Sequence, residues 1–320
     1  METKNIVAAI SLSAAVIILY SLFFAPTSEQ IKKSQNINNL NNIQSSETPL
    51  LDDKEESIVI SRDEAIKESK RIKFENINIK GSISLVGGII DDLIFKNYTY
   101  SLDGTDNIIL LNPKKISDGY YVDTGWVTND KNIDLPDNQS VWKVEGNNIL
   151  NPKSPVTISW ENNQGIRFEK KYKIDDKFLF SIEQKIINSS NKIYNFYPYG
   201  QIIRNKSPEI TNFYILHEGL IGVLDEQLIE EDYSDIRDNS YTKNANAGWL
   251  GITDKYWITT LIPQSNRNFR ADFNFKNKFK ASFIETNPIE ANSKSEVSSV
   301  TKIIIAAKEV DVIDGYAENL

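Results

Sequence analysis

The sequence predicts a mainly β fold: a large antiparallel β-sandwich between an N-terminal transmembrane helix and a short C-terminal amphipathic helix. Three observations predict it. Residues 6–25 form an uncharged and mostly apolar run. From Phe74 onward apolar and polar residues alternate, and turn residues recur about every 8–12 positions. Residues 309–320 place apolar side chains at helical spacing.

The apolar run 6–25 has 20 residues, enough for a helix of roughly 30 Å, the thickness of a bilayer's hydrocarbon core. A cleaved signal peptide is the alternative. It fits less well, because Pro26 follows Ala25, the only plausible cleavage point, and Phe23 stands at the −3 position. We therefore expect a retained anchor, with residues 1–5 as a short tail and the large domain exported.

Residues 26–57 are polar, Asn-rich and acidic, and lack the apolar surface that would offset the entropy of ordering. They predict a disordered linker. Ser61 and Glu64 then stand at capping-box spacing, which predicts the start of a short helix.

The segment "INIKGSISLVGGIIDDLIF" (77–95) alternates apolar and polar residues on both sides of Gly87-Gly88 and predicts strand, turn and strand. Further runs with strand character follow: 107–113, 119–127, 140–146, 155–162, 165–174, 178–188 and 193–204.

The segment "GWLGITDKYWITTLIP" (248–263) is too apolar for a surface loop and predicts a hairpin, with arms 248–253 and 256–262 around Asp254-Lys255. We expect Trp249, Tyr256 and Trp257 to pack into or beside the sandwich core. An aromatic platform for a ligand is the alternative interpretation.

The C-terminal stretch first predicts a closing strand over 303–307. Residues 309–320 then predict an amphipathic helix whose apolar side carries Val310, Ile313, Ala317 and Leu320. We expect this helix to dock on protein rather than on lipid, because its only nearby lysine is Lys308.

Composition excludes several classes of function. The net charge is −8 and no basic stripe is present, so we expect no nucleic-acid partner. The chain has no cysteine, which removes disulfides, thiol nucleophiles and Cys-ligated metals. His217 is the only histidine, and with Glu218 it could form a general acid–base pair. Such chemistry usually needs further polar residues around the ring, and the spacing of the sequence does not assemble them, so we interpret His217 as a hydrogen-bonded structural residue and assign no catalytic residue.

The acidic run "EQLIEEDYSDIRDNS" (226–240) could offer oxygen ligands, but it lacks the spacing of a calcium loop and predicts a solvated surface segment. No phosphate-binding, dinucleotide-binding or zinc-protease motif is present. The sequence therefore assigns no metal site, no cofactor-binding residue and no cofactor.

Five segments in one order resemble the periplasmic domain of the bacterial membrane protein insertase family YidC (YidC/Oxa/Alb), in its alphaproteobacterial form. The segments are 81–98, 125–142, 196–204, 213–226 and 248–263. The resemblance covers nearly the whole chain.

The resemblance implies a β-supersandwich similar to sugar mutarotases. It also implies a non-enzymatic part of an insertase that assists insertion and folding of inner-membrane proteins, with or without the Sec translocon. The expected parts are a cytoplasmic tail (1–5), an anchor (6–25), a linker (26–57), a periplasmic domain (58–307) and a helix (308–320) leading to a membrane core. The family's insertion groove lies in that core, for which these 320 residues hold no segment, so we expect an N-terminal part.

The expected partners are nascent membrane proteins, Sec translocon subunits and the lipid bilayer of the bacterial inner membrane. Two alternatives remain open from the residues themselves. One is an anchored carbohydrate-binding or epimerase-like periplasmic protein. The other is an anchored β domain that only docks partners.

Overall fold

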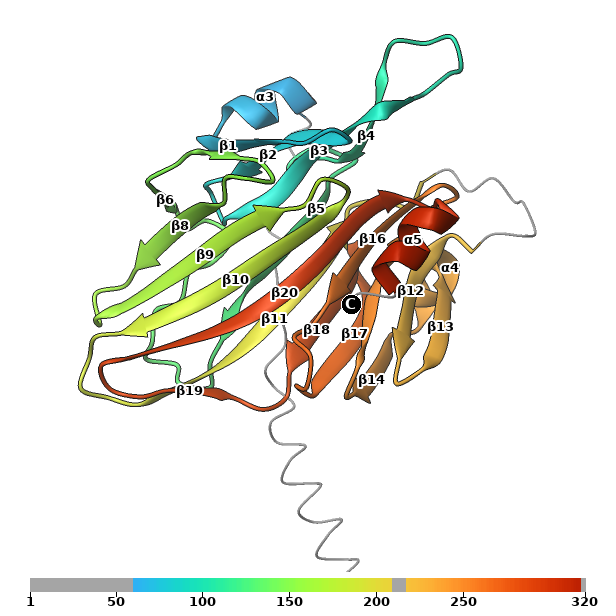
Figure 1. Ribbon diagram of the computed structural model, residues 1–320. Helices are drawn as coiled ribbons and strands as arrows, with labels where there is room; N and C mark the ends of the chain where they lie inside the picture. The colour runs from blue at the N-terminus through green and yellow to red at the C-terminus, as the bar shows by residue number, and fades with distance from the viewer. Residues whose placement is uncertain (1–59, 209–216, 318–320) are drawn as a thin grey trace, which may run out of the picture. The chain divides into compact units, whose positions relative to one another are not determined.

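The computed structural model describes residues 60–208 and 217–317, which belong to one compact unit, Thr48–Leu320 (Figure 1). The predicted anchor (6–25) and linker (26–57) lie outside the described residues. Within the part described, no helix has the length and apolar character needed to cross a bilayer.

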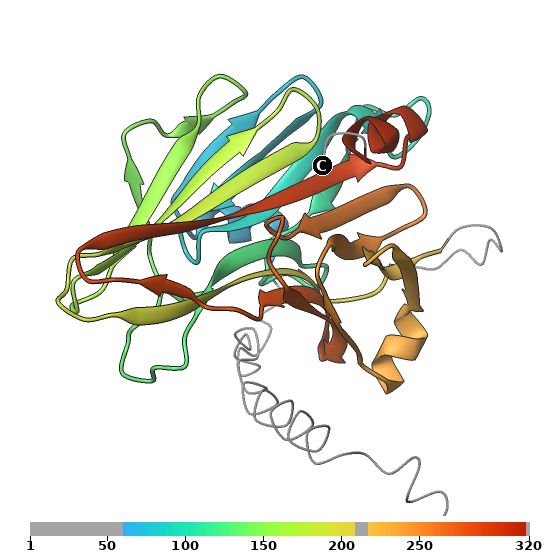
Figure 2. The same ribbon diagram turned by 60° about the horizontal axis from the view of Figure 1, so that its bottom comes forward.

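Two large sheets pack face to face, as Figures 1 and 2 show. Of the strand pairs described, β1 with β7 is parallel and the others are antiparallel. The first sheet has 11 strands: β14 (Tyr241–Ala245), β17 (Phe269–Lys276), β18 (Lys278–Glu285), β11 (Tyr194–Arg204), β5 (Tyr120–Val127), β3 (Ile89–Thr99), β2 (Ile79–Ser84), β1 (Arg71–Glu75) and β7 (Ile149–Leu150), with β4 (Asn107–Leu111) beside β3 and β19 (Ile289–Ala291) beside β11.

The second sheet has nine strands: β13 (Gln227–Asp232), β12 (Gly219–Leu224), β15 (Gly248–Thr253), β16 (Trp257–Ile262), β20 (Ser295–Ala307), β10 (Leu179–Asn188), β9 (Ile166–Ile174), β8 (Val156–Glu161) and β6 (Lys143–Glu145). A strand lies within each run predicted from the alternation. The predicted mainly β, antiparallel sandwich is therefore confirmed.

The core forms where the inward faces of the two sheets meet. Along β9 and β10 every second residue is buried, as the two-residue period of a strand requires. Aromatic rings join the layers: Phe74 meets Phe180 edge to face at 5.2 Å, and Phe168 meets Phe196 at 5.9 Å. Such pairs add about 0.5–1.5 kcal/mol each beyond the area that they bury.

The predicted capping box is confirmed at the start of α3 (Arg62–Lys67). The Ser61 side chain accepts from the Glu64 amide, and the Glu64 carboxylate accepts from the Ser61 amide at 2.9 Å. The predicted turn at Gly87-Gly88 also lies between β2 and β3. Both glycines have positive φ (79° and 63°), a conformation that other residues rarely adopt.

The predicted Trp-rich hairpin is confirmed as β15 and β16, paired from Leu250–Leu261 to Thr253–Ile258. Trp249 and Trp257 are half-buried and pack against the core. The expectation for Tyr256 was wrong: its side chain is 57% exposed, because Tyr256 belongs to the turn and the second arm begins at Trp257.

The predicted C-terminal helix is present as α5 (Val310–Ala317), but the residue that packs it against the domain is not the one expected. Val310, expected on the packed side, is 72% exposed, whereas Tyr316 is buried. The junction explains the difference. The Lys308 amide donates to the Tyr256 carbonyl at 2.8 Å, and this bond fixes the direction in which the first turn leaves β20. The side chains of Ile313, Ala317 and Leu320 lie outside the described residues.

Candidate functional site

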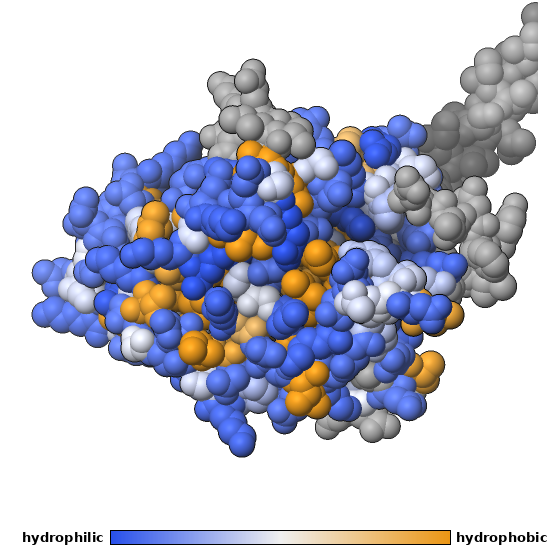
Figure 3. All heavy atoms as spheres, turned by 90° about the horizontal axis from the view of Figure 1, so that it is seen from above, coloured by the Kyte–Doolittle hydropathy of each residue, from blue (hydrophilic) through white to orange (hydrophobic). Residues whose placement is uncertain are grey.

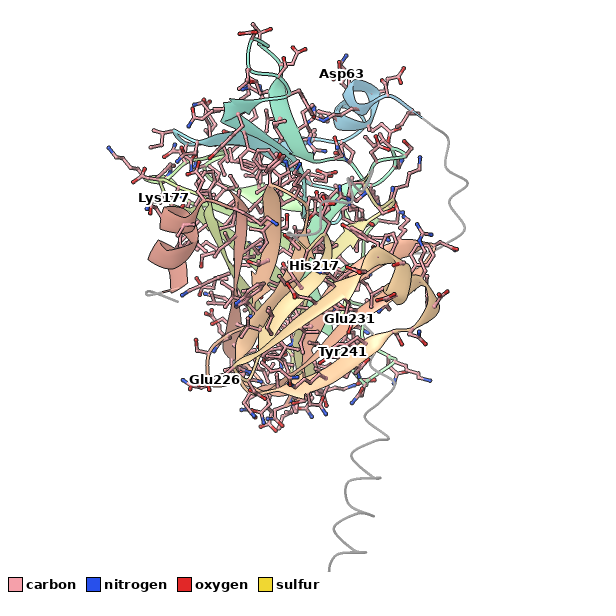
Figure 4. All side chains as sticks on the ribbon, turned by 90° about the vertical axis from the view of Figure 1, so that its right-hand side faces the viewer. Asp63, Lys177, His217, Glu226, Glu231 and Tyr241 are labelled. Carbon is pink, nitrogen blue, oxygen red and sulfur yellow. The ribbon has the colours of Figure 1, made fainter. Side chains whose placement is uncertain are left out.

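His217 lies just before β12, and its ring packs over Gly219, where a Cβ atom would lie 3.0 Å from the ring (Figure 4). Its Nε2 atom lies 3.0 Å from the Leu220 carbonyl, and its Nδ1 atom lies 3.2 Å from Asp232 Oδ1. Both ring nitrogens therefore face acceptors of the protein itself. This geometry is that of the hydrogen-bonded histidine predicted from the sequence.

Glu218 does not pair with His217. Its carboxylate accepts from the Lys255 amide at 2.9 Å and so holds the β15–β16 turn. The acidic run is divided between β13 and α4 (Tyr233–Asp238), where Tyr233 and Ile236 are buried and most of the acids are exposed. Within the described ranges, no group of three or more acidic or histidine side chains is arranged to hold a metal ion.

A cluster of polar side chains lies buried between the strands, around Lys170 of β9. The Lys170 Nζ atom is 3.7 Å from Asp123 Oδ1, 3.3 Å from the Gly88 carbonyl and 5.1 Å from the centre of the Trp142 ring. Asp123 Oδ2 accepts from the Tyr199 hydroxyl and from Gln201 Nε2, each at 2.9 Å. We call these residues the interior polar cluster.

Burial governs the electrostatics of this cluster. Loss of solvent lowers the pKa of Lys170, and the nearby Asp123 carboxylate opposes that effect. Burial, together with the charge of Asp123, raises the pKa of Tyr199 well above its usual value. The geometry pairs Lys170 with Asp123, whose carboxylate also accepts two hydrogen bonds.

The space beside the cluster is very small, about 10 Å³. Trp142 Nε1 and Thr124 Oγ1 line it and have no hydrogen-bond partner in the part of the chain described. A volume of this size accommodates about one water molecule. No sugar or other organic ligand fits there without rearrangement of the sheets.

The end of the sandwich where α5 lies is open, unlike the small space beside the interior polar cluster. Four aromatic rings form a ladder from the core to the surface here. Phe178 meets Phe95 at 6.0 Å, Trp257 stacks on Phe95 at 4.8 Å, and Tyr98 meets Trp257 edge to face at 5.3 Å. The Tyr98 hydroxyl donates to Glu309 at 2.6 Å; burial and this carboxylate raise the pKa of Tyr98 to about 12.

Two open grooves flank Trp257. One, of about 540 Å³, runs between the β3–β4 loop and the β20–α5 junction and is lined by Leu102, Tyr256 and Lys308 among others. The other, of about 500 Å³, is lined by Tyr100, Tyr120 and Arg204 among others. Arg204 is ion-paired with Asp254 and donates to the Tyr233 hydroxyl at 3.1 Å, so its charge is already neutralised.

We define the aromatic end by five exposed residues: Tyr100, Leu102 and Tyr256, which line these grooves, and Ile77 and Val310, which follow Asn76 and Glu309 in the sequence. Figure 3 looks down on the upper side of the molecule, where hydrophobic atoms reach the surface in separate patches between hydrophilic ones. The aromatic end is the most open apolar surface that the grooves reveal, and we take it as the candidate functional site.

Sequence reasoning did not identify Lys170 or Asp123. For Lys170 a signal existed, because it stands between Phe168 and Tyr172 on the inward side of β9's alternation. The exposed Leu102 also had a signal, since it is a single large apolar residue in the polar loop "SLDGTD".

Residues 71–320 match the family of the YidC periplasmic domain. A membrane protein insertase YidC from Pelagibacter ubique is 53% identical over 100% of this chain and 57% of its own length. Relatives of the same name from Mesorhizobium japonicum and Rickettsia bellii are 36% and 34% identical, over 82% and 98% of this chain. They are covered over 44% and 56% of their own lengths, so this chain spans about half the length of these relatives.

Solved structures show the same fold at low identity. A galactose mutarotase related enzyme from Lactobacillus acidophilus is 11% identical with a TM-score of 0.50, covering 75% of this chain and 99% of that one. A protein from Synechocystis gives 8% identity and a TM-score of 0.50, over 75% of this chain and 96% of that one. The predicted mutarotase-like architecture is confirmed, and the likeness extends to the fold alone.

Proposed function

Because the chain belongs to the YidC periplasmic domain family of membrane protein insertases, we propose that it assists the insertion and folding of inner-membrane proteins, with or without the Sec translocon. The observation that carries the proposal is the 53% identity with the Pelagibacter insertase over the whole chain. The relatives are insertases rather than enzymes, so the role is one of binding and positioning.

The proposal includes a domain arrangement. Residues 1–5 lie in the cytoplasm, 6–25 anchor the chain in the inner membrane, and 26–57 form the linker. Residues 58–307 form the periplasmic domain, and 308–320 lead the chain from that domain toward the membrane. The position of α5 directly after β20 supports the last step, because only Lys308 and Glu309 separate the two elements.

Two features weigh against the carbohydrate-binding or epimerase-like alternative. The interior polar cluster leaves about 10 Å³, too little for a sugar ring. Both nitrogens of His217 already face acceptors of the protein, so neither is available as a general acid or base. No specific feature of the described residues favours sugar chemistry.

Amine-reactive cross-linking in intact cells tests the proposed partners. Lysines are spread over the surface of the described domain, so the method does not assume which face binds. We expect adducts with newly made membrane proteins or Sec subunits, and none with a matched chain that lacks residues 1–25. A membrane-located chain that yields no such adducts would contradict the insertase assignment.

Mass spectrometry of the mature protein tests the anchor. Residues 6–25 should remain attached, because Pro26 follows the only plausible cleavage point. A mature chain that starts near Pro26 or Thr27 would show that the segment is a cleaved signal.

A further inference from the structure

We propose that the aromatic end rests on the surface of a phospholipid bilayer, with Tyr100, Leu102 and Tyr256 entering the headgroup region. The proposal rests on the membrane location proposed above. It assigns a specific face of the domain and a specific kind of contact, shallow and apolar.

The loops that carry the aromatic end are tied to one another. Asn76 Nδ2 of the β1–β2 turn donates to the carbonyls of Asp175 and Lys177 in the β9–β10 turn, at 2.8 and 2.9 Å. The Tyr316 hydroxyl of α5 donates to Asp175 at 2.6 Å. The Tyr98–Glu309 and Lys308–Tyr256 bonds connect the remaining loops. These bonds place the exposed residues on one end of the sandwich, where Figure 2 shows α5 close to the β3–β4 hairpin.

Exposed apolar side chains are concentrated at this end. Of the nine large hydrophobic residues that are exposed in the described part of the chain, five belong to the aromatic end. Leu102 is fully exposed in the loop between β3 and β4, which Figure 1 shows projecting from the body of the domain. Contact of this apolar surface with water is unfavourable by about 25 cal/mol per Å², so covering it would stabilise the molecule.

The distribution of these residues favours a lipid surface over a protein partner. A protein interface has a contiguous, well-packed centre, usually one or two anchors in fitted pockets. Here the exposed apolar side chains belong to separate segments: the β1–β2 turn, the β3–β4 loop, the β15–β16 turn and the start of α5. A fluid headgroup layer accommodates such separate side chains, each at its own depth.

The residue types also match a bilayer interface. Tyrosine and tryptophan concentrate there, because they combine an apolar ring with a polar group. Lysines can extend their ammonium groups to the phosphates while their methylenes stay in apolar surroundings. Lys177, Lys255 and Lys308 are placed to do so, and Figure 4 shows Lys177 beside α5.

Charge does not drive the contact. The exposed acids Asp103 and Asp106 of the β3–β4 loop, with Glu309 and Asp311 at the start of α5, offset the three lysines. Anionic lipid therefore gains nothing over neutral lipid, unlike the case of a basic amphipathic surface. The proposal is consequently specific: the contact forms on zwitterionic membranes and resists added salt.

The absence of cysteine makes a site-specific test simple. Leu102→Cys carries an environment-sensitive fluorophore in the full chain of 320 residues, reconstituted into phosphatidylcholine vesicles. Leu228→Cys is the matched control, since Leu228 is also an exposed leucine (56%) and follows the β12–β13 turn, whose Glu226 lies far from Lys177 in Figure 4. Neither change removes a buried contact.

We expect lipid-borne quenchers to remove more than about half of the emission at position 102, since interfacial side chains enter roughly 5–10 Å into the headgroup boundary. Emission at position 228 should be unaffected. Equal responses at 102 and 228 would overturn the proposal. So would quenching that appears only with phosphatidylglycerol, or shielding of position 102 from water without quenching by lipid, which would indicate a protein partner.

Flotation of the vesicles separates this proposal from the one on which it rests. A chain that floats with the vesicles while position 102 stays in water overturns the docking and leaves the anchored insertase standing. A chain that fails to float overturns the membrane anchorage, and with it both proposals.

Discussion

The interior polar cluster and the aromatic end differ in their access to solvent. The cluster gathers a lysine, an aspartate, a glutamine and a tyrosine, yet it is closed around about 10 Å³ and its charged groups already have partners. The aromatic end is open instead, through grooves of about 500 and 540 Å³, the first of which is also lined by Asp118, Arg204 and Asp254. The interior polar groups are thus enclosed, whereas the aromatic rings and the Arg204–Asp254 pair border open grooves.

The difference teaches how a fold shared with sugar-converting enzymes can serve a different purpose. In this chain the polar side chains between the strands stabilise one another and leave no room for a substrate. The open part of the molecule is the aromatic end, which we propose as a contact surface. Substitutions in the two regions test whether the interior polar cluster is structural and whether the core holds the aromatic end in place.

The largest effect is expected at the interior polar cluster. Lys170→Met should lower the free energy of unfolding by about 3 kcal/mol, because it leaves the buried Asp123 carboxylate without its cation. Urea unfolding of a fragment covering 58–320 measures this. Lys173→Met is the matched control on the exposed side of the same strand and should change stability by less than about 0.5 kcal/mol. Equal effects of the two changes would show that the cluster is not structural.

Trp257→Ala should lower the free energy of unfolding by about 2 kcal/mol. This is less than the roughly 3–5 kcal/mol typical of a fully buried tryptophan, since Trp257 is half-buried although it stacks on Phe95. Thermal unfolding measures the loss, and Tyr256→Ala in the adjacent turn serves as control with little change. An unaltered midpoint for Trp257→Ala would mean that the aromatic ladder does not support the open end.

The pH dependence of stability should report on Lys170. Burial lowers its pKa in the folded state below the unfolded value of about 10.5, so between the two values the unfolded chain binds more protons. Stability should therefore rise with pH in that window, by at most about 1.4 kcal/mol per pH unit. Unfolding measured as the pH rises toward the unfolded value of about 10.5 should show a slope that Lys170→Met removes. The same slope in both proteins would assign it to other groups.

Tyr316→Phe should destabilise the docking of α5 by about 1 kcal/mol, because it removes a hydroxyl that donates to Asp175 and accepts from the Phe178 amide. Hydrogen exchange of the backbone over 310–317 measures the change directly. Exchange in β9 and β10 is the internal control and should stay as slow as before. Unchanged protection of α5 would show that other contacts hold the helix.

The smallest effect is expected for His217→Ala, a loss of about 1 kcal/mol or less, since one side of the ring faces an exposed aspartate. No sugar should be turned over by either protein. Mutarotation that is present in the native chain and disappears with His217→Ala would overturn the structural interpretation of this residue.

The order of strands along the chain was predictable, because alternation and turn residues mark each strand locally. The β15–β16 hairpin illustrates this success, and Tyr256 illustrates its limit. A residue beside a turn packs into the core only if it belongs to the hydrogen-bonded part of the strand. The apolar pattern of the sequence does not show at which residue that hydrogen bonding begins.

The alternation of apolar and polar residues could not predict which distant segments come into contact. Asp123 and Lys170 lie on β5 and β9 of different sheets, so only the packing of the sheets brings them together. The helix α5 shows the same limit. Its apolar spacing favoured Val310 as a packed residue, but the direction of exit from β20 placed Tyr316 against the β9–β10 turn instead. The aromatic end likewise combines three loops and the start of α5, which span more than 200 residues of the sequence, from Ile77 to Val310.

The connection of α5 to β20 has a mechanical consequence. β20 runs in the middle of its sheet, paired with β10 from Ser295 to Ile304 and with β16 from Lys302 to Ala307. Hydrogen bonds of an antiparallel ladder lie perpendicular to the strands, so tension applied through α5 along β20 shears many of them at once. The bonds must then break together rather than one by one. A pull from the C-terminal side would therefore move the domain as a rigid body before it could extract the strand.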